Sequence, residues 1–314
     1  MSCLILSLHS GRVRWFNPHM ILSEIRSLAA RHARADLRTG IDGVLIIRAD
    51  HPYPPAPTTY GKVFALIAQG MKRCAVGDRV FDYGPGQYLL TSVELPVTSH
   101  FTRASPEAPG LGVGLALDPA LVAEMLLLGD HAGRNDTGPP SGIGVGEAST
   151  DLLDAVVRLL RLLDRPADVD ALAPLIKREI VWRLITGPQG EVLRQLGLPD
   201  SSFNQIARAV RWIRDHYSEP FRVEDLAQRA GLSLSAFHRN FLAVTALSPI
   251  RFQKQLRLQQ ARLQLAADPN DVAGVSKRIG YESPSQFSRE YRRQFGTSPS
   301  QDGQRLFSGG RASV

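Results

Sequence analysis

The segment GYESPSQFSREYRRQFGTSP, residues 280–299, decides the fold of the last third of this 314-residue chain. Phe287, Tyr291 and Phe295 follow one another at intervals of four residues, which places them along one stripe of an α-helix. The remaining faces of that helix carry three arginines: Arg289, Arg292 and Arg293. The pattern predicts a helix with an aromatic face turned inward and a cationic face turned outward.

The same pattern occurs earlier in the chain. A short helix is predicted over residues 223–230, ending at Gly231, after which Ser233 caps a second helix. Gly280 and Ser283 repeat this order, with the two capping serines fifty residues apart. Glycine is needed where the chain reverses because it adopts a positive φ without strain. A helix, a tight turn and a capped second helix form a helix-turn-helix, so the sequence predicts two of them.

A longer helix is predicted between the two motifs, over residues 249–266. At a rise of 1.5 Å per residue it spans ~27 Å. That length brings the two second helices near the ~34 Å that separates successive major grooves on one face of DNA. Arg and Gln side chains match base edges and phosphates, so the module is predicted to read two adjacent grooves. For either helix alone, a solvated basic face is the alternative.

Charge is concentrated in the same region. Residues 201–314 carry 17 Lys and Arg against 9 Asp and Glu, whereas residues 1–200 carry 20 against 21. The net charge of +7 therefore lies in the last third of the chain. Such asymmetry indicates an anionic partner for one domain only. The alternative is that a basic balance serves solubility alone.

The first two thirds of the chain are predicted to be rich in β-structure. Five short apolar or alternating runs separated by turn signals are typical of an antiparallel sandwich or small barrel. These runs cover residues 43–49, 60–70, 73–84, 86–97 and 111–118. Helices are expected over 20–38, after the capping pair Asp118-Pro119, and over 151–163 and 173–185, with a loop over 136–150.

The fold class predicted from these patterns is α+β: a β-barrel or sandwich with flanking helices, followed by an all-α domain. The predicted segments are an unplaced extension (1–19), a β-rich domain with flanking helices (20–186), a linker (187–202), the double helix-turn-helix (203–302) and a tail (303–314). Met20 is an alternative start of translation.

The C-terminal region resembles the paired helix-turn-helix of the AraC/XylS family of bacterial transcription regulators. The resemblance covers residues 204–300 and is carried by VEDLAQRAGLSLSAFHRNFLAVTALSP, RLQQARLQL and RIGYESPSQFSREYRRQFGTSP. Ala246 stands where the family usually has glycine, and Ser276 where it usually has alanine. Both residues are small, so we expect the fold to tolerate them.

The resemblance implies which residues meet DNA. In the family, outward residues in the first turns of each recognition helix contact bases. The matching positions here are Ser235, His238 and Arg239 in the first helix, and Ser285, Gln286 and Arg289 in the second. Phosphate contacts are expected from Arg292, Arg293 and Arg257. For Arg239 an internal salt bridge is the alternative, and for His238 a surface position without base contact.

The N-terminal region resembles, more loosely, the cupin-like sensor domain of one branch of this family, through LIAQGMKRCAVGDRVFDYGPGQYLLTSVELPV. The resemblance implies that it binds a small molecule or mediates dimerisation, and that the whole protein is an activator working with RNA polymerase. The stripe Leu152, Val156, Leu159 and Leu163 is interpreted as a dimer seam, packing on the barrel being the alternative. The alternative to a ligand-sensing regulator is a DNA-binding regulator that acts without a ligand.

No catalytic, cofactor or metal site is predicted. The eight histidines never form a His-x-His pair, and neither a Gly-x-Ser-x-Gly nor a phosphate-binding Gly-Lys-Ser/Thr signature occurs. A cupin-type enzyme fused to the DNA-binding module is therefore a minor alternative.

The compartment expected from the sequence is the cytoplasm. No run of eighteen apolar residues occurs, and the N-terminal stretch makes a poor signal peptide. The two cysteines, Cys3 and Cys74, lie in different segments, which argues against a disulfide framework. Cys74 follows Lys72-Arg73, whose charges would favour a reactive thiolate, so a sensing role is an alternative to a buried, inert thiol.

Overall fold

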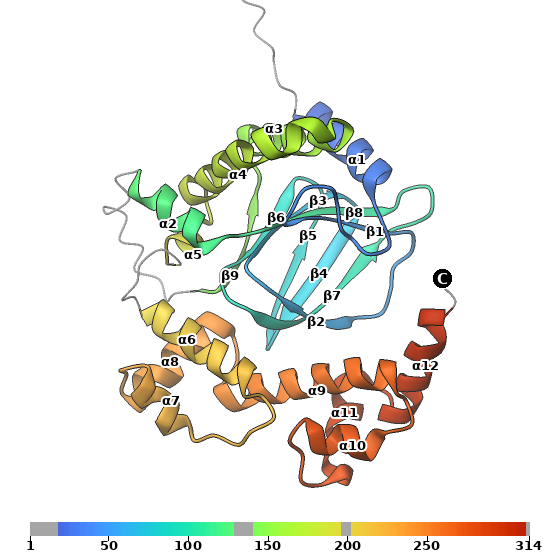
Figure 1. The fold of residues 1–314 in the computed structure, drawn as a ribbon, viewed down its shortest axis with the longest axis vertical. Coiled ribbons are helices and arrows are strands. Elements are labelled where there is room, and N and C mark those ends of the chain that lie inside the picture. Colours follow the sequence, from blue (N-terminus) through green and yellow to red (C-terminus); the bar gives the residue numbers. More distant parts are fainter. Residues whose placement is uncertain (1–17, 129–140, 196–201, 312–314) are drawn as a thin grey trace, which may run out of the picture.

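The computed structural model describes residues 18–128, 141–195 and 202–311. A β-sandwich covered by helices on one side is followed by an all-helical C-terminal part that lies along the other side (Figure 1). The predicted α+β class is confirmed. The predicted extension over 1–19, the linker and the chain end fall partly outside the described residues, at 1–17, 196–201 and 312–314.

The sandwich consists of two antiparallel sheets. One has five strands in the order β1-β8-β3-β6-β9, and the other has four in the order β2-β7-β4-β5. The strands are β1 Val44–Ala49, β2 Ala56–Tyr60, β3 Val63–Gln69, β4 Met71–Val76, β5 Arg79–Tyr83, β6 Gln87–Thr91, β7 Leu95–Arg103, β8 Gly110–Ala116 and β9 Ile143–Glu147. All five predicted runs contain strands.

The predicted loop over residues 136–150 is wrong in its second half, where β9 pairs with β6. Glycines alternate along β9, which weakens the strand signal in the sequence. Gly146 faces the buried Tyr88 ring and leaves little room for a side chain, whereas the atom nearest Gly144 is the end of a flexible side chain. A Cβ at Gly144 would lie 2.2 Å from the Gln189 side chain, and one at Gly146 would lie 2.9 Å from Tyr88.

A helical layer covers the outer face of the five-stranded sheet (Figure 1). It consists of α1 Pro18–His32, α3 Thr150–Arg161 and α4 Val169–Thr186, together with the shorter helices α2 Pro119–Leu127 and α5 Gly190–Arg194. Two 3-10 turns, η1 Leu162–Asp164 and η2 Pro166–Asp168, join α3 to α4. Val192 and Leu193 of α5 belong to the hydrophobic core beneath this helical layer. That core therefore extends beyond residue 186, where the predicted N-terminal domain ends.

The interpretation of the α3 stripe as a dimer seam is wrong. Leu152, Val156 and Leu159 are at most 3% exposed within the single chain, and α3 packs against both α1 and α4. Leu163 lies beyond α3 and is partly buried against the same core. The 3.6-residue periodicity correctly predicts that this face of α3 is buried. The helices that cover it, however, are α1 and α4 of the same chain and not a second copy.

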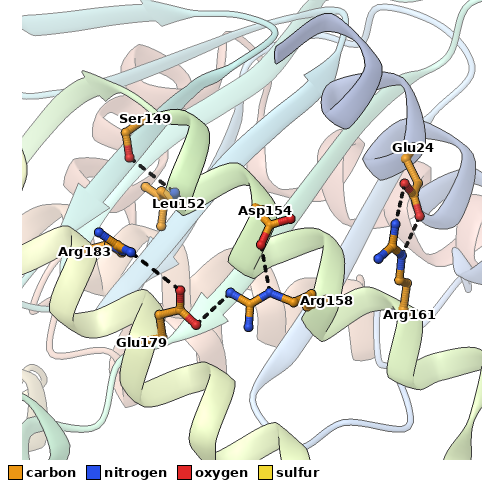
Figure 2. Close-up of polar contacts among 8 residues, drawn as sticks. All are labelled: Glu24, Ser149, Leu152, Asp154, Arg158, Arg161, Glu179 and Arg183. Atoms are coloured by element: carbon orange, nitrogen blue, oxygen red, sulfur yellow. Dashed lines mark hydrogen bonds and ion pairs between the residues drawn. The ribbon is translucent and has the colours of Figure 1, made fainter. Parts of the chain in front are cut away.

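Ion pairs fasten the helical layer at its outer surface (Figure 2). Arg161 of α3 donates two hydrogen bonds, of 2.6 and 2.8 Å, to the carboxylate of Glu24 in α1. Arg158 joins Asp154 of its own helix to Glu179 of α4, at 2.8 and 2.7 Å. These side chains are partly solvated, so each pair contributes at most about 1 kcal/mol and mainly fixes the angle between helices.

The C-terminal part contains seven helices in the described range: α6 Ser202–Asp215, α7 Val223–Arg229, α8 Leu234–Thr245, α9 Pro249–Ala267, α10 Val272–Arg278, α11 Pro284–Phe295 and α12 Pro299–Arg311. The predicted tail from 303 onward is the second half of α12, which packs along α9. None of the helices in the described ranges has both the length and the apolarity that crossing a bilayer requires.

Candidate nucleic-acid interface

The first helix-turn-helix consists of α7 and α8. Its turn passes through Gly231 at φ +69°, and the Ser233 hydroxyl accepts a hydrogen bond from the Ala236 amide at 3.3 Å. Phe237 and Phe241 are fully buried behind α8. The predicted contact residues lie on its exposed side: Ser235, His238 and Arg239. The cap, the turn and the buried aromatics are as the sequence predicts.

The second helix-turn-helix, α10 and α11, repeats this construction. The Ser283 hydroxyl accepts from the Gln286 amide at 3.3 Å, and Pro284 occupies the first turn. Phe287 and Tyr291 are fully buried. The exposed side carries the other predicted contact residues: Ser285, Gln286, Arg289, Arg292 and Arg293.

The arginines on the exposed faces of both helices lack internal partners. Within the described ranges, no ion pair involves Arg239, Arg289, Arg292 or Arg293. The alternative of an internal salt bridge for Arg239 therefore finds no support there. Their guanidinium groups present planar donors to whatever approaches this surface.

Gly280 is required for two separate reasons. Its φ of +84° lies in the left-handed region, which disfavours residues with a side chain. In addition, a Cβ at this position would lie 1.9 Å from the carbonyl oxygen of Ser218. The turn of the second motif is thus pressed against the loop that follows α6, which joins the two motifs into one body.

Arg257 has a structural position that the sequence did not indicate. Its Nε donates to the Tyr217 carbonyl at 2.6 Å and its Nη1 to the Gly280 carbonyl at 2.9 Å. Its Nη2 donates to the carbonyls of Ser218 and Glu219 at 3.1 and 3.2 Å. Burial lowers the pKa of this guanidinium. The group already serves four acceptors between the motifs, so a DNA phosphate would have to compete with them.

A second polar cluster, also missed in the sequence, sets the position of α11. Glu290 accepts from Lys254 Nζ of α9 at 2.5 Å and from the Tyr281 hydroxyl at 2.7 Å. Burial raises the pKa of Glu290, but these two donors outweigh it and hold the pKa below its usual value. Gln286 lies beside this carboxylate, at 3.5 Å, on the wall of a hollow of about 380 Å³ between the two motifs.

The two parts of the molecule are in direct contact. The Gln259 side chain of α9 accepts from the Thr59 hydroxyl at 2.9 Å and donates to the carbonyls of Thr58 and Val97 at 3.1 and 3.4 Å. In the last turn of α8, the Val244 carbonyl accepts from the amide of Gly142, just before β9, at 3.0 Å. The helix that connects the motifs therefore rests on the four-stranded sheet.

Ala246, at the end of α8, has a backbone conformation that disfavours it. Its φ is +57°, whereas Gly296 occupies the same place after α11 at φ +75°. The left-handed region costs a residue with a Cβ about 1–2 kcal/mol, part of which is offset because alanine has less freedom than glycine when unfolded.

We expect Ala246→Gly to raise the free energy of unfolding by about 0.5–1 kcal/mol, measured by urea denaturation. Gly296→Ala is the matched control and should lower it by a similar amount, since a Cβ there meets no atom within 4 Å. A destabilised Ala246→Gly protein would show that the left-handed backbone is not strained.

The thiol of Cys74, for which sensing is an alternative role, lies in the core of the sandwich. Cys74 is fully buried on β4, and burial raises its pKa to about 12 despite the nearby charge of Lys72. A thiol with so high a pKa carries almost no thiolate at neutral pH. Burial and the raised pKa therefore favour the buried, unreactive cysteine over the sensing alternative. No cluster of three or more His, Cys, Asp or Glu suited to a metal ion occurs among the described residues.

Comparison with known proteins gives two family matches. A model described as the AraC-type transcriptional regulator N-terminus matches residues 40–192, and one described as a helix-turn-helix domain matches residues 226–305. The HTH-type transcriptional activator RhaS of Salmonella agona is 32% identical over 152 residues, which cover 47% of this chain and 53% of RhaS. RhaS of Escherichia fergusonii is 31% identical over 150 residues, covering 47% and 52%. The chain thus spans about half the length of the curated relatives it matches.

Solved structures of ToxT from Vibrio cholerae share the fold of most of the chain. One, bound to an unsaturated fatty acid, has a TM-score of 0.51 at 11% identity and covers 86% of this chain and 97% of its own. Another, bound to (E)-4-(8-methylnaphthalen-1-yl)but-3-enoic acid, has a TM-score of 0.52 at 11% identity and covers 84% and 98%. With both halves matched and this order of domains, the chain belongs to the AraC family of helix-turn-helix transcriptional regulators.

Proposed function

We propose that the protein is a sequence-specific DNA-binding transcription regulator. One observation carries the proposal: a single chain presents two capped helices of the same construction, each with buried aromatics behind it and, in front, arginines that form no ion pair with the described residues. Exposed arginines on the free face of a helix-turn-helix suit the major groove and its phosphates. The basic balance of residues 201–314 supports the same partner.

Each exposed residue has a proposed task. Gln286 would pair with adenine and Arg289 with guanine, because their donors and acceptors match those base edges in pairs. Ser235, His238, Arg239 and Ser285 would approach bases from the first turns of their helices. Arg292 and Arg293 would bind phosphates and fix the register. We assign Arg257 a structural task, since its donors already serve four carbonyls.

The connecting helix supports the reading of two adjacent grooves. Its 19 residues span ~29 Å at 1.5 Å per residue. This is close to the ~34 Å of one duplex turn, so both recognition helices would address the same face of the DNA. The cluster around Arg257 holds the two motifs in one arrangement, which reduces the ordering required on binding.

The N-terminal sandwich is proposed to sense a small molecule and to change the pose of the DNA-binding part. Gln259 ties α9 to β2 and β7, so a ligand that favours one arrangement of those strands shifts the population of poses. Because the similar protein RhaS is a transcriptional activator, we propose that this protein activates transcription too. RNA polymerase would then be its partner at the promoter. The protein would act by binding rather than catalysis, in the cytoplasm. A homodimer would need a surface other than the buried α3 stripe.

The proposal is tested with purified full-length protein and fragmented genomic DNA. We expect selected fragments to be retarded in gels, with hydroxyl-radical footprints in two patches about 10–10.5 base pairs apart on one face. Affinity should fall steeply between about 50 and 200 mM salt, because the arginines displace counterions. If no fragment is retarded at low salt, the protein is not a DNA-binding regulator.

A further inference from the structure

A buried lysine without an acceptor lies inside the β-sandwich. Lys72 of β4 points between the sheets and is only 3% exposed. Its cross-strand neighbours are Tyr83 on β5 and Phe101 on β7. Nζ lies 5.5 Å from the centre of the Phe101 ring and 5.6 Å from that of Tyr60. In the described part of the chain, its ammonium forms no ion pair and no hydrogen bond with a side chain or carbonyl.

The Lys72 ammonium in this arrangement has no acceptor for its N–H groups and no counter-charge within the described residues. An ammonium carries three donors, and burying it without acceptors is strongly unfavourable. The faces of two aromatic rings attract a cation, but they offer none of its N–H groups a lone pair. A buried donor group left without a partner in a native fold indicates a missing water, ion or ligand.

A second unsatisfied group lies on the neighbouring strand. The Tyr83 hydroxyl is buried and forms no well-aligned hydrogen bond among the described residues, although the Tyr60 hydroxyl lies near enough to affect its pKa. Burial raises the pKa of Tyr83 well above its usual value, so the hydroxyl keeps its proton and can donate. Because Lys72 and Tyr83 face each other across β4 and β5, a single acceptor between them would satisfy both.

The surroundings suit the apolar body of an organic molecule. Along the β1 edge, Leu45 is 37% exposed, and Ile47 and Ala49 are only partly buried although they face the other sheet. Tyr53 is partly buried too, and meets Phe101 edge-to-face with ring centres 6.4 Å apart. Apolar side chains are thus left incompletely covered within the sandwich that holds the ammonium, as in ligand sites that combine apolar walls with few polar groups.

We infer that Lys72 and Tyr83 bind the carboxylate of a small apolar or aromatic monocarboxylic acid within the sandwich. One ammonium balances one negative charge, and a phosphate dianion would leave a net charge in a low-dielectric interior. The inference deepens the proposed function, on which it rests for the role of the sandwich as sensor. Tyr60, which borders the site, directly follows Thr59, the residue that donates to Gln259 of α9.

The test is isothermal titration calorimetry on the full-length protein, without DNA. The probes are 3-phenylpropionate, 4-phenylbutyrate, hexanoate and octanoate, each paired with its primary amide. We expect at least one acid to bind, with its amide at least tenfold weaker, because the neutral amide lacks the charge that Lys72 requires. Lys72→Met should weaken that acid at least tenfold. Lys177→Met, a lysine of α4 that donates to the Asp42 carbonyl, should leave it unchanged.

The inference is overturned if acid and amide bind equally, if Lys72→Met binds the acid as the wild type does, or if none of the four acids binds. Circular dichroism checks the fold of Lys72→Met. Should that variant not fold, Tyr83→Phe replaces it, with an expected three- to tenfold loss, and an unchanged affinity contradicts the site. Gel retardation by the wild type without acid is measured separately, so a failure of DNA binding is distinguished from a failure of acid binding.

Discussion

Replacement of Asp302 by asparagine is expected to destabilise the C-terminal part by about 3–5 kcal/mol, because it removes one partner of a buried ion cluster. The Asp302 carboxylate, 0% exposed, accepts from Arg262 Nε at 2.8 Å, from Arg305 Nη2 at 2.6 Å and from the Tyr291 hydroxyl at 2.9 Å. Asparagine keeps the shape but not the charge. The largely buried Arg262 is then left uncompensated beside the core of the second motif.

The cluster also predicts how the effect varies with pH. Burial raises the pKa of Asp302, but the donors from Arg262 and Tyr291 outweigh it, and the pKa lies below its usual value. The stabilisation is therefore present above the unfolded-state pKa of about 3.9 and is lost as pH falls through the folded pKa. We expect the difference between wild type and Asp302→Asn to be full at pH 7 and to shrink below about pH 4.

Urea denaturation at several pH values measures this difference. Asp268→Asn is the control, since Asp268 is exposed and accepts only from the Asn270 amide, and it should change stability by less than about 0.5 kcal/mol. An Asp302→Asn protein as stable as the wild type at pH 7 would contradict the importance given to the cluster.

The second large effect is expected in DNA binding. Arg289→Ala should weaken binding to the operator by about 1–3 kcal/mol, a factor of roughly 5 to 150, and relax specificity at one base pair. The reason is that Arg289 is exposed in the first turns of α11, where no ion pair within the described residues holds its guanidinium. On the proposed assignment, the variant loses a bidentate contact with guanine.

Arg292→Ala is the matched control, from the last turn of the same helix. A phosphate contact carries no sequence information, so this variant should weaken all sites alike and reduce the salt slope by about one. Both variants are measured by fluorescence anisotropy on the selected operator and on every single-base variant of it, at several salt concentrations. If Arg289→Ala weakens all sequences equally, Arg289 binds phosphate and the assignment of base contacts is incorrect.

The C-terminal helices could be predicted from the sequence because their signals are local. Ser233 and Ser283 cap helices through bonds that span three residues, and the glycines mark turns that need a positive φ. Helical periodicity likewise separated the buried aromatics from the exposed contact residues. The same reasoning failed at β9, where alternating glycines hide a strand whose need for a small residue at Gly146 arises from Tyr88.

Contacts between distant segments could not be predicted. The four carbonyls around Arg257 come from the loop after α6 and from the turn of the second motif, so nothing near Arg257 in the sequence announces them. The Gln259 contact with β2 spans two hundred residues in the same way. The burial of Lys72 was also missed: it shares the buried face of β4 with Cys74 and Val76, but a lysine is ordinarily solvent-exposed.

The hydrophobic core beneath the four-stranded sheet unites the two halves of the chain. Val97 and Phe101 of the sandwich belong to the same cluster as Phe241 and Phe252 of the helical part. Neither half can therefore melt without baring apolar surface on the other, and the molecule is expected to denature as one cooperative unit. A fragment that ends near residue 200 is expected to expose the apolar surface of this cluster and to aggregate. A ligand that stabilises the sandwich should also stabilise the helical part against unfolding.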